Sequence, residues 1–352
     1  MSGSVPAGDG SEHPSPALRI DRADAETAVT VAVRAPSIHN TQPWRWELDA
    51  GGLLLFADRD RQLAVADPDG HSLLISCGAA LHLTELALRA EGFAVDVERL
   101  PEPGDPDLLA RFSVRGGVSP DDALAARVDA ALRRRSDRRP FALRELDEDV
   151  IEELQRASGG PGARVDFPRL PDQRINLAVA VSWADRVERD DSAYTAEMAR
   201  WLRDPEVHAT ADGIPLEAVP HVPPQHPRRV DLPQRDFEVG VTGRQLIDRD
   251  VDERPLIAVV LTDFDNPRDH LLSGEAMMRL MIEAELRGLA SCPLSQAVDF
   301  AAFRTRVQGL MGWVGYPQIM LRLGYPSSPP AQLPATPRRG PDSVLTVRGS
   351  GS

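Results

Sequence analysis

The sequence contains no lysine, and all 40 of its basic residues are arginine. Catalysis through a lysine Schiff base is therefore excluded, because that chemistry needs a primary side-chain amine. Any phosphate that the chain binds must be held by guanidinium groups or backbone amides. The 54 acidic residues give a formal charge of -14, which would repel a polyanion, and no basic stretch is long enough to offset it. We therefore expect no nucleic-acid partner.

Cysteine and long apolar runs are also scarce. Cys77 and Cys292 are the only two cysteines among 352 residues and lie far apart, so neither a disulfide framework nor a zinc cluster is expected. No apolar run approaches the roughly 18–20 residues that cross a bilayer, which argues against a membrane partner. Residues 1–20 are mostly small and polar, with no apolar signal segment, so we expect a disordered tail on a cytoplasmic protein.

The common catalytic and nucleotide-binding motifs are missing. There is no G-x-G-x-x-G after a strand, no P-loop, no G-x-S-x-G and no H-E-x-x-H. The spacing of His208, His221 and His226 matches no zinc pattern, so a surface role is expected for them. Cys292 has no local partner pattern for a nucleophile, and a small buried side chain is the favoured interpretation.

Hydrophobic periodicity and turn residues divide the chain into two units, residues 21–120 and 121–345, and predict an α+β fold. In the first unit we expect helices at 25–33 and 73–90, a hairpin around 51–58, and strands at 93–97 and 108–114. In the second we expect helices near 125–133, 147–157, 172–189, 194–202 and 271–287, and strands at 255–262 and 318–323.

The two longest amphipathic helices indicate an internal repeat. Residues 78–94 and 274–290 agree in length, in their first glycine, in apolar spacing and in the glycine that ends the helix. The offset between them is 196 residues throughout. The sequence therefore predicts two pseudo-repeated halves, although amphipathic helices also share such spacing by chance.

Residues 204–243 lack periodicity and are rich in proline. A loop of this length inside a compact domain is usually a binding segment or lid when it is not disordered. We predict a long lid-like loop within the second half.

The stretch Ala35-Pro36-Ser37-Ile38-His39-Asn40-Thr41-Gln42-Pro43-Trp44 gathers turn formers, short polar side chains and one aromatic ring. Two interpretations remain open on its chemistry alone. It could be a turn whose Ser and Asn satisfy backbone groups, or a segment that meets a polar ligand. Of the five tryptophans we expect four in the core and Trp44 at the ligand, because of its neighbours.

Three other segments could contact a ligand. The run from Arg133 to Arg139 offers guanidinium groups beside Ser136, which suits a phosphate monoester, although a solvated basic face is also possible. Arg338 and Arg339 form a second such group in an extended tail that could fold back. Residues 288–294 (GLASCPL) follow a helix with small side chains, and we expect exposed amides there that a flat ring could approach.

Together these segments resemble the FMN-dependent nitroreductase family. The matching elements are A-P-S-I-H-N-T-Q-P-W at 35–44, R-R-S-D-R at 134–138, G-L-A-S-C-P at 288–293 and the basic pair at 338–339. The first comes before the second, the reverse of the usual family order. That arrangement resembles the Acg-like branch, in which two nitroreductase-like halves are joined in one chain.

The resemblance implies a nitroreductase-like fold whose halves each have a mainly antiparallel sheet flanked by helices. Family members are dimers with flavin sites at the subunit interface, so a fused chain would form an intramolecular pseudo-dimer with one complete site. Arg138 would face the pyrimidine edge of the flavin. The implied FMN-binding residues are Arg134, Ser136, Arg138, Pro293, Leu294, Ser295, Arg338 and Arg339 from the second half, and Ser37 and Asn40 from the first.

The implied activity is hydride transfer from NAD(P)H through FMN to a small aromatic or quinone-type acceptor, with no catalytic side chain required. The long segment at 204–243 keeps an alternative open. A lid that stays closed over the flavin would make the protein an FMN store with little or no turnover.

Overall fold

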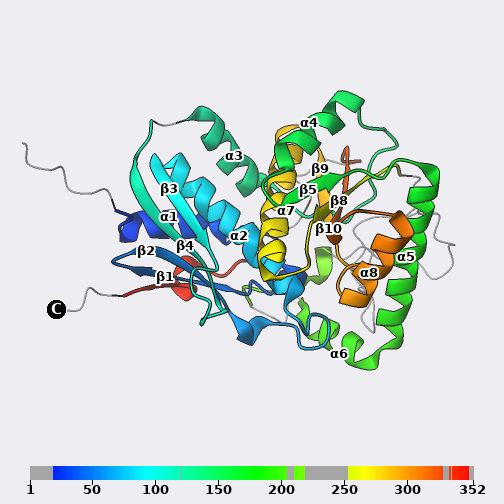
Figure 1. Ribbon diagram of the computed structural model, residues 1–352, viewed down its shortest axis with the longest axis horizontal. Helices are drawn as coiled ribbons and strands as arrows, with labels where there is room; N and C mark the ends of the chain where they lie inside the picture. The colour runs from blue at the N-terminus through cyan, green and yellow to red at the C-terminus, as the bar shows by residue number, and fades with distance from the viewer. Residues whose placement is uncertain are drawn as a thin grey trace, which may run out of the picture.

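The computed structural model describes residues 19–119, 121–203, 210–218, 253–327, 333 and 335–348. Two β-sheets lie toward opposite ends of the molecule, with helices α2 (His71–Ala90) and α7 (Pro267–Leu286) side by side between them (Figure 1). One hydrophobic core runs through both helices and reaches both sheets. The fold is α+β, as predicted.

The first sheet has the strand order β11-β1-β2-β4-β3 and is antiparallel, apart from the parallel pair of β1 and β11. The helices of this half are α1 (Arg22–Ala32) and α2, and α3 (Asp122–Arg133), at the start of the second half, packs against both α2 and α7. Its strands are β1 (Trp44–Asp49), β2 (Gly52–Ala57), β3 (Phe93–Arg99), β4 (Leu108–Gly117) and β11 (Leu345–Val347).

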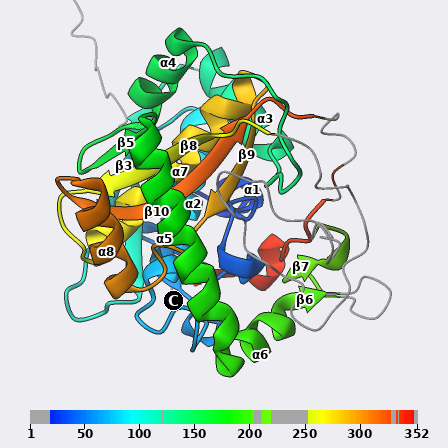
Figure 2. The same cartoon turned by 90° about the vertical axis from the view of Figure 1, so that its right-hand side faces the viewer.

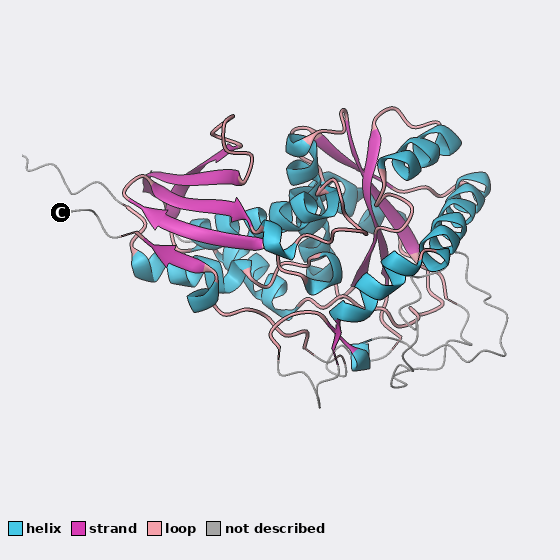
Figure 3. Cartoon of the chain, turned by 90° about the horizontal axis from the view of Figure 1, so that it is seen from below, coloured by secondary structure: helices cyan, strands magenta, loops and turns pink. Residues whose placement is uncertain are grey.

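The second sheet is fully antiparallel, with the order β5-β8-β10-β9, and Figure 3 shows the two sheets from below. Its strands are β5 (Ala163–Asp166), β8 (Leu256–Thr262), β9 (Ala290–Leu294) and β10 (Tyr316–Gly324). The helices of this half are α4 (Glu148–Ser158), α5 (Pro171–Asp190), α6 (Ser192–Trp201), α7 and α8 (Ala301–Met311). A separate two-stranded ribbon pairs β6 (Leu202–Arg203) with β7 (Ile214–Pro215), near α6 in Figure 2.

The predicted repeat is confirmed by the crossing of α2 and α7. A Cβ atom added to Gly78 would lie 2.1 Å from the backbone oxygen of Leu271, and one added to Gly274 would lie 2.0 Å from that of Ile75. Both glycines and both carbonyls are related by the same sequence offset, so the contact is reciprocal, as in the self-complementary interface of a two-fold dimer. Only glycine permits this approach of the two backbones.

Helix α2 is central, and most of its residues are buried. Among the described residues it alone is long and apolar enough to match a membrane span by length and composition, and 78% of that apolar window is buried inside the protein. Burial on almost every side explains its near-continuous apolar sequence.

Several expectations are corrected by the structure. Trp44 is fully buried beside Trp46 and is not among the residues that line the cavity described below, because its position at the start of β1 directs it into the core. Residues 290–294 form strand β9, which pairs with β10 along one side and is the edge strand of the second sheet. The tail beyond Pro326 ends in β11, which joins the sheet of the first half. Strand β5 and helix α8 were not expected.

Two predicted segments lie partly outside the described residues. Of the tail at 1–20, residues 1–18 fall outside, whereas Ile20 is buried in the core, so the folded part begins earlier than expected. Of the lid-like segment 204–243, only 210–218 is described, and it contains β7 and a 3-10 turn at Leu216–Ala218.

Candidate cofactor site

A cavity of about 1000 Å³, counted with its open mouth, lies where the two halves and the C-terminal segment meet. That figure includes open solvent, and the space inside that a water-sized group can occupy is about 120 Å³. Eight of the ten predicted site residues line it: Ser37, Asn40, Ser136, Arg138, Pro293, Leu294, Ser295 and Arg338. The structure thus brings together segments separated by about 100 and 300 residues in sequence.

The wall from the first half is a strained turn. His39, Asn40 and Gln42 have positive φ angles of 45°, 56° and 52°, a region that non-glycine residues seldom adopt. The hydroxyl of Ser37 accepts a hydrogen bond from the Gln42 amide at 3.0 Å and holds the turn closed. Such strain concentrates at functional sites, because only the surrounding structure can maintain it.

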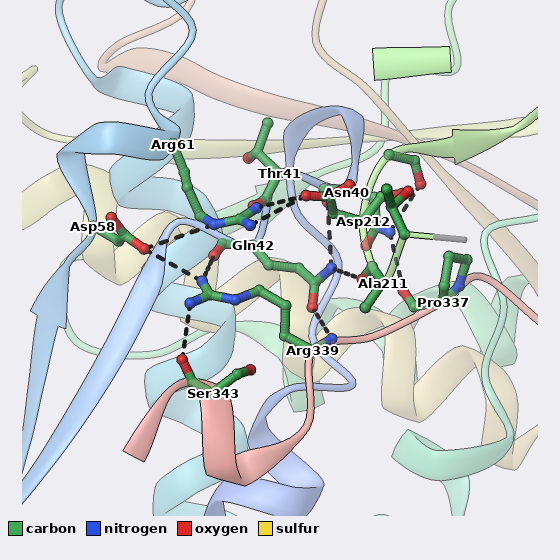
Figure 4. A network of polar contacts seen from close by, with 12 residues as sticks. Asn40, Thr41, Gln42, Asp58, Arg61, Ala211, Asp212, Pro337, Arg339 and Ser343 are labelled. Atoms are coloured by element: carbon green, nitrogen blue, oxygen red, sulfur yellow. Dashed lines mark hydrogen bonds and ion pairs between the residues drawn. The ribbon is translucent and has the colours of Figure 1, made fainter. Parts of the chain in front are cut away.

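Residues 210–215 fasten this turn from outside (Figure 4). The Asn40 side-chain amide donates to the backbone oxygen of Gly213 at 2.9 Å, and that of Gln42 donates to Ala211 at 2.7 Å. Asp212 bridges Arg61 and Arg203, each at 3.1 Å. This segment, which we call the latch, also places Ile214 in the cavity wall.

The wall from the second half is held by strand contacts. Ser136 forms a parallel bridge with Ser291, and the Asp137 amide donates to the Ser291 oxygen at 2.9 Å, so the loop after α3 docks against the start of β9. Pro293 and Leu294 end β9, where pairing with β10 fixes their position. The cavity floor therefore belongs to a rigid sheet.

Four guanidinium groups gather beside the cavity, those of Arg34, Arg134, Arg135 and Arg338. Burial, together with repulsion from Arg135 and Arg34, lowers the pKa of Arg134 to about 10. Burial and repulsion from the other three lower the pKa of Arg338 to about 9. Nε and Nη1 of Arg134 and Nε of Arg338 are buried without a hydrogen-bond partner. Clustered, desolvated donors of one charge sign are a site for an anion.

Arg134 and Arg339 are the two predicted residues that do not line the cavity. Arg134 lies behind the wall, 4% exposed, and donates from Nη2 to the Arg34 oxygen at 3.0 Å. Arg339 points toward the first half, where it contacts Asp58 at 3.3 Å and the backbone oxygens of Gln42 and Ser343. Its side chain is therefore a structural tie in this geometry.

Sequence reasoning missed part of the cavity wall. Ile75, Met277 and Ile319 give it apolar surface, and Gln296 contributes a buried amide nitrogen without a partner. Arg34 immediately precedes the polar stretch and could have been found by extending that stretch by one residue. The central-helix residues carried no signal, because periodicity reports burial and not cavity lining.

Comparison with known proteins identifies the family of the chain. A Mycobacterium tuberculosis protein named as a candidate NAD(P)H nitroreductase, acg, is 35% identical over 92% of this chain and 95% of its own length. The chain belongs to the nitroreductase family, on its Acg-like branch. A second candidate NAD(P)H nitroreductase of the same organism is 34% identical to this Acg-like chain, over 92% of each.

No family model matches this nitroreductase chain. Among solved structures, the FMN- and NADPH-dependent nitroreductase NfnB from sphigopyxis sp. strain HMH is 17% identical, with a TM-score of 0.38, and the match covers 63% of this chain and 99% of that one.

The residues present fit a flavin mononucleotide. The unpartnered nitrogens of Arg134 and Arg338 suit its phosphate, and a phosphate dianion would offset their mutual repulsion. Asn40 Oδ1 and Gln296 Nε2 are also buried without partners and match the polar edges of a flavin. The apolar side chains of Ile75, Met277 and Ile319 suit its ring faces.

Proposed function

We propose that this nitroreductase-family chain binds one FMN in the cavity and acts as an oxidoreductase that takes hydride from NAD(P)H. The observation that carries the proposal is the cluster of buried arginines with unpartnered donors, Arg338 in the wall of a partly apolar cavity and Arg134 behind that wall. FMN, when bound, accepts hydride and passes it to a small aromatic or quinone-type acceptor.

The protein's own residues bind and orient in this proposal. Arg134 and Arg338 hold the phosphate, with Arg34 adding charge behind them. Ser37 and Asn40 approach the cofactor from the first half, and the turn that carries them is held by the latch. Arg138, on the loop that docks against β9, faces the pyrimidine edge and stabilises negative charge there.

Flavin titration tests the proposal directly. Protein stripped of flavin is mixed with FMN, and visible absorbance of the protein fraction is followed after gel filtration. We expect one FMN per chain to co-elute. Protein that stays colourless at saturating FMN would overturn the assignment.

A second function, FMN storage, is favoured by the latch. Its backbone oxygens accept hydrogen bonds from Asn40 and Gln42 of the first half, and its Ile214 lies in the cavity wall. The Asn40 amide also donates to Pro337 of the C-terminal segment. A latch that stayed closed would keep nicotinamide away from the flavin. Anaerobic mixing separates the two functions: loss of the flavin absorbance band within seconds of adding NADPH or NADH supports the enzyme, and reduction by dithionite alone supports storage.

We further propose that the chain works as a monomeric, intramolecular pseudo-dimer in the cytoplasm, with no nucleic-acid or membrane partner. A cavity whose walls come from both halves of one chain supports this arrangement. Sedimentation of the FMN-loaded protein at micromolar concentration should give the mass of one chain, and a dimer mass would refute the monomer.

A further inference from the structure

Two serines of the cavity wall donate hydrogen bonds to the same buried carboxylate. Ser72, at the start of α2 in the first half, donates from Oγ to Oδ1 of Asp299 at 3.2 Å. Ser295, which follows β9 in the second half, donates from Oγ to Oδ2 of Asp299 at 3.2 Å. Both serines line the cavity, whereas Asp299 is 4% exposed and is not among the lining residues. Asp299 therefore joins the two halves from behind the wall.

The carboxylate is itself held in place by its surroundings. Nη1 of Arg304 donates to the backbone oxygens of Val298 and Asp299 at 3.0 and 3.2 Å. The Val298 amide donates to the backbone oxygen of Ser295 at 2.7 Å and closes a turn. Arg304 is buried, and its Nε donates to Asp265 at 3.0 Å. A buried guanidinium thus fixes the turn from which Asp299 presents one oxygen to each serine.

Ser72 is oriented through both its backbone and its side chain. Its amide donates to Asp67 at 2.9 Å, and its hydroxyl hydrogen is directed at Asp299. A hydroxyl has one hydrogen and two acceptor lone pairs, so Ser72 Oγ can only accept a hydrogen bond from the cavity. No residue in the described part of the chain donates to this oxygen, and Ser72 is 5% exposed. A buried acceptor of this kind needs a donor from the ligand.

Ser76 shows the contrast one turn further along α2. It also lines the cavity, but its Oγ donates to the backbone oxygen of Ser72 at 2.7 Å and accepts the Ile38 amide at 3.1 Å. Its hydroxyl is therefore engaged within the protein both as donor and as acceptor. Of these two hydroxyls on the same helix, the one at Ser72 depends on the ligand for its donor.

The polar groups of the cavity match the pyrimidine edge of a flavin, which presents an oxygen, an N–H and an oxygen in that order. The Arg138 guanidinium and the unpartnered Nε2 of Gln296 are donors, and Ser72 Oγ is an acceptor. We propose that Ser72 accepts the N3–H of FMN and that Asp299 is the positioning residue that keeps Ser72 an acceptor. This inference rests on the proposed function, because it needs FMN in the cavity. It makes the site selective for a ring that carries an N–H at this edge.

The test uses the full chain, stripped of flavin and titrated with FMN and with 3-methyl-FMN, in which a methyl group replaces the N3 hydrogen. Flavin fluorescence gives both Kd values, and their ratio is the readout. We expect the wild type to bind 3-methyl-FMN at least about tenfold more weakly, because Ser72 Oγ loses its donor. A chain that binds both flavins equally would overturn this inference and leave the proposed function standing, whereas a chain that binds neither would overturn both.

Variants separate positioning from a general structural effect. Ser72→Ala and Asp299→Ala should each lower the ratio to about threefold or less, and Ser76→Ala, the matched control, should keep it at about tenfold. The double variant of Ser72 and Asp299 should bind FMN as Ser72→Ala does, because Asp299 acts through Ser72. Multiplied losses in the double variant would refute the positioning role. Loss of the ratio in Ser295→Ala with retention in Ser72→Ala would refute the assignment of the acceptor.

The test does not depend on the stability of one variant. Asp299→Ala removes a buried carboxylate and could disturb folding, so the wild-type ratio and the ratio in Ser72→Ala decide the outcome without it. An unchanged ratio in folded Ser72→Ala would overturn the inference.

Discussion

The two halves share one scaffold but differ in the segment between the first helix and the first strand. The first half runs α1-β1-β2-α2-β3-β4, and the second runs α4-β5-β8-α7-β9-β10 with added elements after β5 and with α8 between β9 and β10. The strand orders β1-β2-β4-β3 and β5-β8-β10-β9 correspond. In the first half, residues 33–43 connect α1 to β1 and contain the strained polar turn. In the second, residues 159–162 connect α4 to β5.

The short connection leaves no room for a site. A Cβ atom added to Gly160 would lie 2.8 Å from Arg279 Nη2, and Arg279 Nε donates to the Ser158 oxygen at 3.2 Å. A side chain of α7 therefore covers the position where the first half carries its polar turn. The second half instead has its long insertion after β5, where α5, α6 and the latch lie. The two halves therefore share a fold without each carrying a complete cofactor site, because each half supplies only one wall of the single cavity.

The sharpest test of the shared scaffold is the helix crossing. Gly78→Ala and Gly274→Ala should each cost about 4 kcal/mol or more of unfolding free energy, because the new Cβ would meet a backbone carbonyl and force α2 and α7 apart. Urea unfolding measures both. Gly309→Ala in α8, with nothing within 4 Å, is the control and should be neutral or stabilising. A large loss at one glycine alone would show that the crossing is not reciprocal.

The two central helices also begin differently, and this difference should appear in the pH dependence of stability. Asp67 accepts the amides of Ser72 and Leu73 at 2.9 and 2.7 Å at the start of α2, whereas Asn266 accepts two amides at the start of α7. Burial, reinforced by the charge of Asp299, raises the pKa of Asp67 to about 7 despite those two hydrogen bonds.

A raised carboxyl pKa means that the folded state binds more protons than the unfolded state between about pH 4 and pH 7. The contribution of Asp67 to stability is therefore present at low pH and is lost as the pH rises through that window, by on the order of 3 kcal/mol. Asp67→Asn, which makes the two helix starts alike, should flatten the curve of unfolding free energy against pH. Parallel curves for the wild type and the variant would contradict this prediction.

FMN affinity should depend on the arginines beside the cavity and not on Arg279, which lies at the corresponding place in the second half. Arg134→Ala and Arg338→Ala should each weaken FMN binding by about 2 kcal/mol, or about thirtyfold, through loss of a charge-assisted hydrogen bond to the phosphate. Arg279→Ala, at the corresponding place in the second half, is the matched control and should leave FMN affinity unchanged. Fluorescence titration of FMN measures all three. Equal losses in all three would mean that the phosphate lies elsewhere.

The smallest effect is expected at the latch. Asp212→Asn removes the shared ion pairs with Arg61 and Arg203, and release of FMN should become about fivefold faster, corresponding to about 1 kcal/mol for partly exposed pairs. Stopped-flow fluorescence follows the release. Asp263→Asn, which removes an exposed pair with Arg164 away from the cavity, should not change the rate. An unaltered rate in Asp212→Asn would show that the latch does not retain the cofactor.

The central helices and the main strands could be predicted from the sequence, because their apolar spacing is a direct record of burial. Helix α2 and strand β10 agree with expectation to within a few residues. Strand β11 could not be predicted, since three partly exposed residues carry no pattern and pair only when the chain returns to β1. Trp44 was misassigned because the polar turn ends before it, and Trp44 begins β1, where it shares the buried face of Trp46 two residues along.

Site residues could be predicted where they stand in short stretches of unusual composition. Ser37, Asn40 and Arg338 stand in unusual stretches, and the structure places all three on the cavity. Arg134 and Arg339 stand in equally suggestive stretches, yet the direction in which each guanidinium points is set by packing.

The pairing of β11 with β1 has a consequence for biosynthesis. Trp46 pairs with Leu345, so the first sheet stays incomplete until β11 is synthesised about 300 residues after β1. At 5–20 residues per second, a ribosome leaves β1 uncovered on that side for roughly 15–60 s. Arg338 emerges in the same final interval. Translation that stops before Leu345 would release a chain with an open sheet edge, so complete synthesis and protection from aggregation are coupled in this molecule.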